Sequence, residues 1–284
     1  MTLVVAFLTC IPMTCAEDLS SLPVKTGEKI VFLGDSITAF GWNAPLGYVK
    51  LVVSGLETNG VKVEPIPAGI SGQMSSDMLA RFAHDVVLKK PDWVTISCGV
   101  NDVWHGTNGV ELDAYKTNMT AMVDQAQAAK IKVVILTATM IKEEPTNALN
   151  QKLAAYNEFL RNLAVEKKCV LADLNAQMQA SIADSVKAGA KPGNLLTADG
   201  VHMNPDGNIM MGRGVLKALG LKQTQLDKAD AAWLEIPDGV DIKANDKMTL
   251  GKFHKLQKVA SEQKQSVQQY SDALLAKTLK DAVK

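Results

Sequence analysis

Short runs of apolar residues recur along the middle of the chain, separated by longer segments in which apolar residues stand three or four positions apart. Runs of this length are typical of strands buried on both faces of a parallel sheet. The runs occupy Ile30–Leu33, Val61–Ile66, Trp93–Cys98, Val133–Thr137 and Val170–Leu174.

The segments between these runs carry apolar stripes with helical spacing, most clearly over Met78–Val86, Met119–Ala126 and Leu153–Leu163. Strands that alternate with helices predict right-handed crossovers. We therefore expect an α/β fold with a five-stranded parallel sheet that helices cover on both faces. In such a sheet, ligands bind at the carboxyl ends of the strands.

The amino-acid composition excludes several classes of protein. The 284 residues are 47% hydrophobic and 21% charged, which is ordinary for a globular protein. The 30 basic and 30 acidic side chains cancel, so the chain lacks the basic excess with which nucleic-acid-binding proteins neutralise phosphates. The four cysteines are too few for a small disulfide-stapled scaffold. We expect no nucleic-acid partner and no membrane span, and the oligomeric state stays open.

The two ends of the chain differ from the middle. Residues 1–16 have no charged side chain, contain the apolar run Leu3–Leu8 and end in small residues, which is typical of a cleaved export signal. No Lys or Arg precedes the apolar run, and a buried N-terminal strand is the alternative. We expect an exported protein, periplasmic or secreted, with its main domain over 17–222.

Residues 223–284 have few strand signals and two helical patterns, which predicts a helical C-terminal extension. From Lys247 onward, lysines outnumber acidic residues 8 to 3. Such a face is typical of solvated helices docked on the main domain, and a surface for a partner is the alternative.

Residues suited to acyl transfer follow the predicted strands. Gly34-Asp35-Ser36-Ile37 follows the first run, Ser71-Gly72 the second and Gly99-Val100-Asn101-Asp102 the third, while Asp199-Gly200-Val201-His202 precedes the last core helix. We expect Ser36 to be the nucleophile, His202 the base that takes its proton and Asp199 the carboxylate that orients the imidazole. The backbone N–H groups of Ser36 and Gly72 and the amide of Asn101 would stabilise the oxyanion.

Taken singly, these residues have ordinary structural explanations, since Gly34 and Gly72 suit turns and Asn101 suits an Asx turn. Their order along the chain makes the functional interpretation the stronger one. Trp42, Trp104 and His105 follow two of these turns, so we expect them at the rim of the substrate pocket, with loop packing as the alternative. No cluster of residues has metal-ligand or nucleotide-loop spacing, so we expect neither metal nor cofactor.

The four segments together resemble the sequence blocks of the SGNH (GDSL-type) hydrolase family, over about residues 28–220. The resemblance implies a three-layer α/β/α flavodoxin-like sandwich and a metal-free serine esterase with Ser36, Gly72, Asn101 and His202 in the family's defining positions. Ile37 replaces the leucine of the GDSL signature. In the second block either Gly69 or Gly72 could donate to the oxyanion, and the family's Ser-Gly pair favours Gly72.

We therefore expect an exported serine ester hydrolase that works through an acyl-enzyme, on short acyl esters such as O-acetylated carbohydrates. A single-domain lysophospholipase or thioesterase acting on longer acyl chains is one alternative. A non-catalytic carbohydrate-binding module on the same fold is another.

Overall fold

The computed structural model describes residues 22–237, 250–265 and 267–283. The chain divides into two compact units, Met1–Gly239 and Val240–Lys284. The expected export signal over 1–16 lies outside the described residues. Among those that are described, no helix is long and apolar enough to cross a bilayer.

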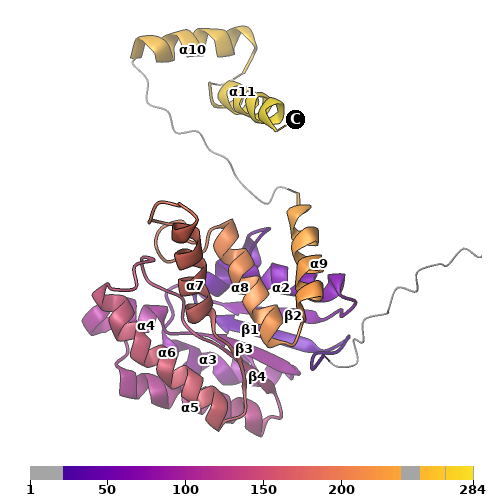
Figure 1. The fold of residues 1–284 in the computed structure, drawn as a ribbon, viewed down its shortest axis with the longest axis vertical. Coiled ribbons are helices and arrows are strands. Elements are labelled where there is room, and N and C mark those ends of the chain that lie inside the picture. The colour runs from indigo at the N-terminus through magenta and orange to yellow at the C-terminus, as the bar shows by residue number, and fades with distance from the viewer. Residues whose placement is uncertain (1–21, 238–249, 266, 284) are drawn as a thin grey trace, which may run out of the picture. The chain divides into compact units, whose positions relative to one another are not determined.

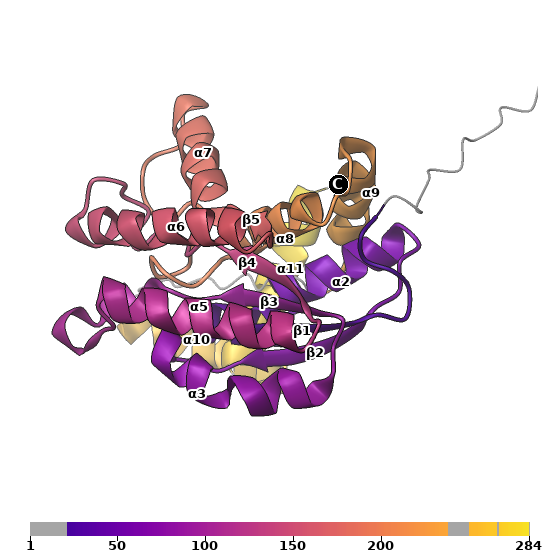
Figure 2. The same cartoon turned by 90° about the horizontal axis from the view of Figure 1, so that it is seen from below.

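The first unit is built on one parallel sheet of five strands, in the order β2-β1-β3-β4-β5; Figure 1 labels the first four of these and Figure 2 also labels β5. The strands are β1 (Lys29–Gly34), β2 (Glu64–Gly69), β3 (Trp93–Ser97), β4 (Lys132–Leu136) and β5 (Val170–Ala172). The side chains of β1, β3 and β4 are buried almost throughout, as expected for strands covered on both faces.

Helices follow each strand. They are α1 (Ser36–Asn43), α2 (Tyr48–Thr58), α3 (Ser75–Asp85), α4 (Val100–Trp104), α5 (Leu112–Ala128), α6 (Ala148–Glu166), α7 (Leu174–Lys187), α8 (Pro205–Ala218) and α9 (Gln223–Leu234), with short 3₁₀ turns η2 (Val87–Lys89) and η3 (Gly106–Asn108). The second unit contains α10 (Leu250–Glu262) and α11 (Val267–Ala282), which pack on each other.

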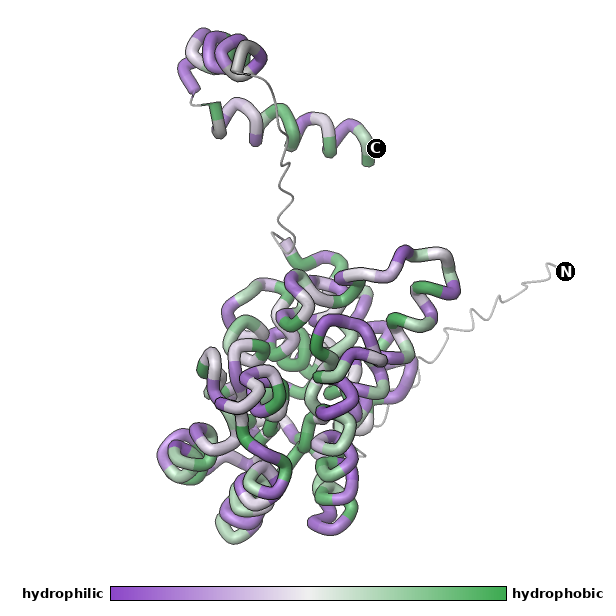
Figure 3. Tube along the Cα trace, turned by 90° about the vertical axis from the view of Figure 1, so that its left-hand side faces the viewer, coloured by the Kyte–Doolittle hydropathy of each residue, from purple (hydrophilic) through white to green (hydrophobic). Residues whose placement is uncertain are grey.

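The helices of the first unit form two layers. In one layer α5 packs between α3 and α6, and in the other α2 packs on α8 and α9, with α7 beside α8 (Figures 1 and 2). Hydrophilic and hydrophobic positions alternate along the outer helices, as Figure 3 shows, because each helix turns an apolar stripe toward the sheet. This is the three-layer sandwich expected from the sequence.

The second strand differs from its prediction. It covers Glu64–Gly69 instead of Val61–Ile66, and Glu64 and Pro67 are exposed because the strand lies at the edge of the sheet. The backbone N–H of Glu64 donates to Glu28 O, just before β1, and that of Ile70 donates to Gly34 O at the end of β1, so the alternate positions Pro65 and Pro67 turn their nitrogens away from β1. Proline has no N–H to offer a further strand, and this protects the edge.

The C-terminal boundary also differs from the expectation at residue 222. Helix α9 belongs to the first unit, where Leu226, Ala229 and Trp233 are buried. Trp233 packs where α2 and α8 have no side chain: a Cβ added to Gly55 would come within 3.1 Å of the indole, and one added to Gly212 within 3.4 Å. The glycines therefore let α9 approach both helices, and α9 is part of the first compact unit, Met1–Gly239.

Candidate active site

Ser36 is the first residue of α1, directly beyond the carboxyl end of β1. Asp35 caps the helix, since its Oδ1 accepts the backbone N–H of Ile37 at 2.9 Å. This turn directs the Ser36 hydroxyl into the space above the sheet and leaves the side chain only 7% exposed.

Three side chains form one hydrogen-bonded chain. His202 Nε2 lies 2.9 Å from Ser36 Oγ, and His202 Nδ1 lies 2.6 Å from Asp199 Oδ2. The other Asp199 oxygen accepts the backbone N–H groups of Val201 at 2.9 Å and His202 at 2.8 Å. Burial raises the pKa of Asp199, but the hydrogen bonds from His202 and the two backbone donors outweigh it and lower the pKa to about 2. Asp199 is therefore a carboxylate at neutral pH.

Two further predicted residues face the same space. Gly72 has φ = +79°, and a Cβ added there would meet nothing within 4 Å, so its backbone conformation alone favours glycine. A Cβ on Gly69, by contrast, would lie 2.3 Å from the backbone nitrogen of Ala39, so that glycine serves the packing of β2 on α1. The Asn101 amide, on α4, donates to Gln73 O at 3.0 Å.

These groups surround a cavity of about 400 Å³. Its lining comes from α1, the loop after β2, α4 with the residue that follows it, and the loop before α8. The lining residues are Ser36, Phe40, Ser71, Gly72, Asn101, Trp104, His105, Asp199, Val201 and His202.

Of the three residues expected at the pocket rim, Trp104 and His105 line the cavity and Trp42 does not. Trp42 lies in the last turn of α1 and packs against the hydrophobic core, with Lys50 Nζ 6.0 Å from its ring centroid. The helix explains the difference, because residues six positions apart do not share a helical face. The loop-packing alternative therefore describes Trp42.

Phe40 is the aromatic residue that sequence analysis missed at this cavity. Its ring centroid lies 4.9 Å from that of His202 with the planes tilted by 51°, and the side chain is 49% exposed. Phe40 stands four residues after Ser36 on α1, so helical spacing could have placed both on one face.

Two buried carboxylates lie behind the nucleophile. Burial raises the pKa of Asp35 to about 6, and the nearby charge of Asp102 adds to the effect, although the Ile37 N–H and the His202 charge oppose it. Burial also raises the pKa of Asp102, which accepts the Ser75 hydroxyl at 2.5 Å. Asp102 thereby ties the start of α3 to α4, which carries Asn101.

Arg81 holds the loop that contains Gly72. Its guanidinium donates to Gln73 Oε1 at 2.6 Å, to Ala68 O at 2.8 Å and to Gly34 O at 3.1 Å. Asp85 accepts a fourth hydrogen bond at 2.8 Å. One side chain therefore joins the ends of β1 and β2 to the segment that turns toward Ser36. No sequence motif marked Arg81.

These positions agree with a family comparison. Residues 32–208, more than half of the chain, match the GDSL-like Lipase/Acylhydrolase family. The chain belongs to this family. It is a serine carboxylic ester hydrolase of the SGNH type, and the recognition made from the sequence is confirmed.

Known proteins of this family resemble the chain over most of its first unit. An acetylxylan esterase from Geobacillus stearothermophilus is 27% identical over 222 residues, which are 71% of this chain and 98% of the relative. Its crystal structure aligns with a TM-score of 0.62 over 70% of this chain and 97% of its own. The crystal structure of another acetyl xylan esterase is 33% identical, with a TM-score of 0.62 over 67% and 98% of the two chains. Esterase TesA from Pseudomonas aeruginosa is 27% identical, over 62% of this chain and 79% of its own.

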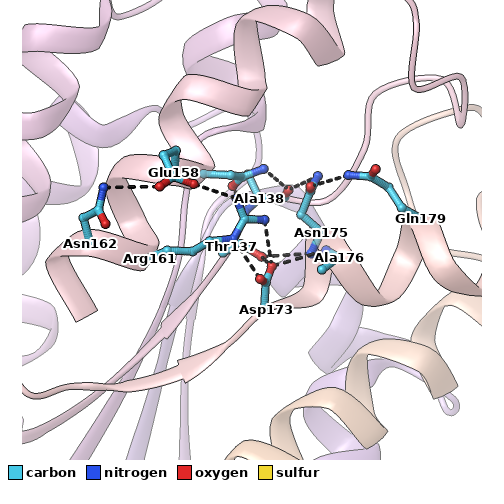
Figure 4. A network of polar contacts seen from close by, with 10 residues as sticks. Thr137, Ala138, Glu158, Arg161, Asn162, Asp173, Asn175, Ala176 and Gln179 are labelled. Carbon is cyan, nitrogen blue, oxygen red and sulfur yellow. Dashed lines mark hydrogen bonds and ion pairs between the residues drawn. The ribbon is translucent and has the colours of Figure 1, made fainter. Parts of the chain in front are cut away.

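A second polar network lies at the carboxyl ends of β4 and β5 (Figure 4). Asp173 accepts Thr137 Oγ1 at 2.9 Å and Arg161 Nε at 2.8 Å, and Asn175 donates to Ala138 O at 3.1 Å. These groups satisfy one another, so we assign the network to holding α6 and α7 on the sheet. Within the described segments, no three His, Cys, Asp or Glu side chains group as metal ligands would.

Proposed function

We propose that this esterase forms an acyl-enzyme on Ser36. The observation that carries the proposal is the hydrogen-bonded chain from Ser36 Oγ through His202 to Asp199, open to the cavity. As Ser36 Oγ attacks the ester carbonyl, His202 Nε2 takes its proton and then gives it to the departing alcohol. Water attacks the acyl-enzyme by the same route in reverse, and the carboxylic acid leaves.

The oxyanion of each tetrahedral intermediate would accept hydrogen bonds from the backbone N–H groups of Ser36 and Gly72 and from the Asn101 amide. The positive φ of Gly72 and the open space beside it support this role. The Asn101 amide already points toward this region, since it donates to Gln73 O and, at 3.4 Å, to Asp35 Oδ2. In the G. stearothermophilus acetylxylan esterase, alanine variants of a serine, an aspartate and a histidine three residues after that aspartate are catalytic mutants.

The substrates we propose are short acyl esters, with O-acetylated carbohydrates as the preferred class. The names of the two acetylxylan esterase relatives support this choice. The cavity supports it as well, because Trp104 and Phe40 are 40% and 49% exposed and offer flat apolar faces on which sugar rings pack. Longer acyl chains, as in a lysophospholipase or thioesterase, are the second candidate.

Acetate release from acetylated xylo-oligosaccharides, compared with hydrolysis of p-nitrophenyl acetate and p-nitrophenyl octanoate, tests this substrate class. We expect kcat/KM to be highest for acetyl esters, and Ser36→Ala to abolish all three activities while the protein remains folded. A clear preference for the octanoate would refute the deacetylase assignment. Unchanged turnover by Ser36→Ala would refute the nucleophile.

We also propose that the protein is exported, with residues 1–16 as the signal. The sequence pattern of residues 1–16 is the only support for export. Expression with an intact N-terminus, followed by fractionation and N-terminal sequencing of the mature protein, tests it. A mature chain that begins at Glu17 outside the cytoplasm is the expected result, and a cytoplasmic chain that retains residues 1–16 would contradict it.

A further inference from the structure

The loop that carries Asp199 and His202 rests on a buried carboxylate from a distant part of the chain. Glu143 lies between β4 and α6 and is 8% exposed. Its Oε2 accepts the backbone N–H of Leu195 at 2.7 Å, and its Oε1 accepts the backbone N–H of Leu196 at 2.9 Å and the Thr197 hydroxyl at 2.6 Å. Three donors from consecutive residues therefore surround the Glu143 carboxyl group.

The contact continues from this carboxylate to the acid and the base. Thr197 Oγ1 accepts the backbone N–H of Gly200 at 3.2 Å, and Gly200 O accepts the backbone N–H of Lys142 at 2.6 Å. The Ala198 N–H donates to His202 O at 2.8 Å, and Thr197 forms a bridge with Met203. These contacts hold the loop 195–203 together, and Glu143 accepts hydrogen bonds from its first three residues.

Side-chain hydrogen bonds fix the backbone on both sides of Glu143. Lys142 and Glu143 both have positive φ, +57° and +33°, which is an unfavourable conformation for residues other than glycine. The Asn150 side chain bonds both the N–H and the carbonyl of Ile141, and the side chains of Asn147 and Asn150 both donate to Glu144 O. Unfavourable backbone conformations that neighbouring hydrogen bonds hold in place cluster at functional sites, where they fix the direction of a particular side chain.

We propose that Glu143 is a positioning residue for catalysis, which holds the loop 195–203 so that Asp199 and His202 stay aligned with Ser36. This inference rests on the proposed function of that triad. A carboxylate suits the role because it has only acceptors, whereas the glutamine of the same shape would turn its NH₂ group toward one of the three donors. Misplacement of a reacting group by about 1 Å costs on the order of 100-fold in rate.

The test compares Glu143→Gln and Glu143→Ala with the matched control Glu144→Gln, whose exposed side chain accepts a hydrogen bond from the Thr146 hydroxyl. With p-nitrophenyl acetate as the probe, we expect kcat to fall about 10-fold in Glu143→Gln and on the order of 100-fold in Glu143→Ala, with KM within about threefold. The control should match the wild type.

A spectroscopic readout separates positioning from folding. The proton that His202 Nδ1 shares with Asp199 should give a far-downfield NMR resonance, identified by its loss in His202→Gln. We expect Glu143→Gln to lose or broaden this resonance while Glu144→Gln keeps it. A Glu143→Gln protein that is less stable but keeps both the resonance and the kcat of the control would overturn the inference.

Thr197→Val tests the same contact if the Glu143 variants do not fold. It keeps the volume of a side chain that is 1% exposed and removes one hydrogen bond to Glu143 and one from Gly200. We expect kcat to fall about fivefold, and wild-type kcat in this variant would count against the proposal. If the wild type shows no Ser36-dependent hydrolysis, the proposed function fails on its own, and the resonance still tests the alignment.

Discussion

Asp35 should cost the protein stability at neutral pH, and its replacement by asparagine makes that cost measurable. The carboxyl is 2% exposed, and burial raises its pKa from 3.8 to about 6. The native state therefore binds a proton more tightly than the unfolded chain does. Between the two pKa values, stability falls as the pH rises. The gap between 3.8 and about 6 corresponds to roughly 3 kcal/mol of stability, and this loss is complete once the pH exceeds the native pKa.

Asparagine carries no charge and still offers an oxygen to the Ile37 N–H. We expect Asp35→Asn to unfold in urea like the wild type near pH 4 and to be about 2–3 kcal/mol more stable at pH 8, with the difference growing between these values. Asp113→Asn is the control, because the Asp113 side chain is 95% exposed and should show no such pH dependence.

The same variant should be a poorer enzyme. The Asp35 charge attracts a protonated His202, so its loss should make proton transfer from Ser36 less favourable and lower kcat. An Asp35→Asn protein that is less stable than the wild type at pH 8, or whose stability difference does not change with pH, would refute this reasoning.

Three more predictions concern other parts of the molecule. Asn101→Ala should lower kcat by about 100- to 1000-fold with a small change in KM, which steady-state kinetics measures; a loss below about fivefold would exclude Asn101 as an oxyanion donor. Trp233→Ala should destabilise the protein by about 3 kcal/mol in urea, the lower end for a buried tryptophan because its Nε1 already lacks a hydrogen-bond partner; a change under about 1 kcal/mol would argue against α9 as part of the core. Removal of residues 240–284 should leave kcat for p-nitrophenyl acetate unchanged, and an inactive or insoluble product would show that the extension supports the first unit.

The sheet could be predicted where burial alone decides the pattern. The runs that became β1, β3 and β4 are apolar because helices cover both faces. At β2 the apolar run began too early, since Val61 and Val63 are buried before the strand begins while the strand itself contains two prolines and exposed positions. Whether a strand lies at the edge of its sheet depends on the tertiary structure, so the spacing of apolar residues along the sequence does not predict it.

Helix α9 was assigned to the extension for a similar reason. Its amphipathic pattern is like that of the helices after it, and only the facing glycines Gly55 and Gly212 reveal its partner surface. No pattern within residues 223–234 carries that information.

The site residues that line the cavity were easier to predict than the residues that support them from outside it. Ser36, Gly72, Asn101 and His202 stand in short motifs after strands or before a helix, and the structure gathers them around one cavity. Arg81 and Glu143 act through contacts with backbone groups far away in the sequence, which no local motif encodes. Phe40 lies between these cases, because its helical spacing from Ser36 was visible.

Trapping the intermediate tests the central claim most directly. The enzyme is mixed with p-nitrophenyl acetate, quenched in acid within the first turnover and digested, and the peptides are examined by mass spectrometry. We predict an acetyl group on the peptide that contains Ser36, at Ser36 itself, and no such adduct in Ser36→Ala. Acetylation at another residue, or full turnover by Ser36→Ala, would contradict the account.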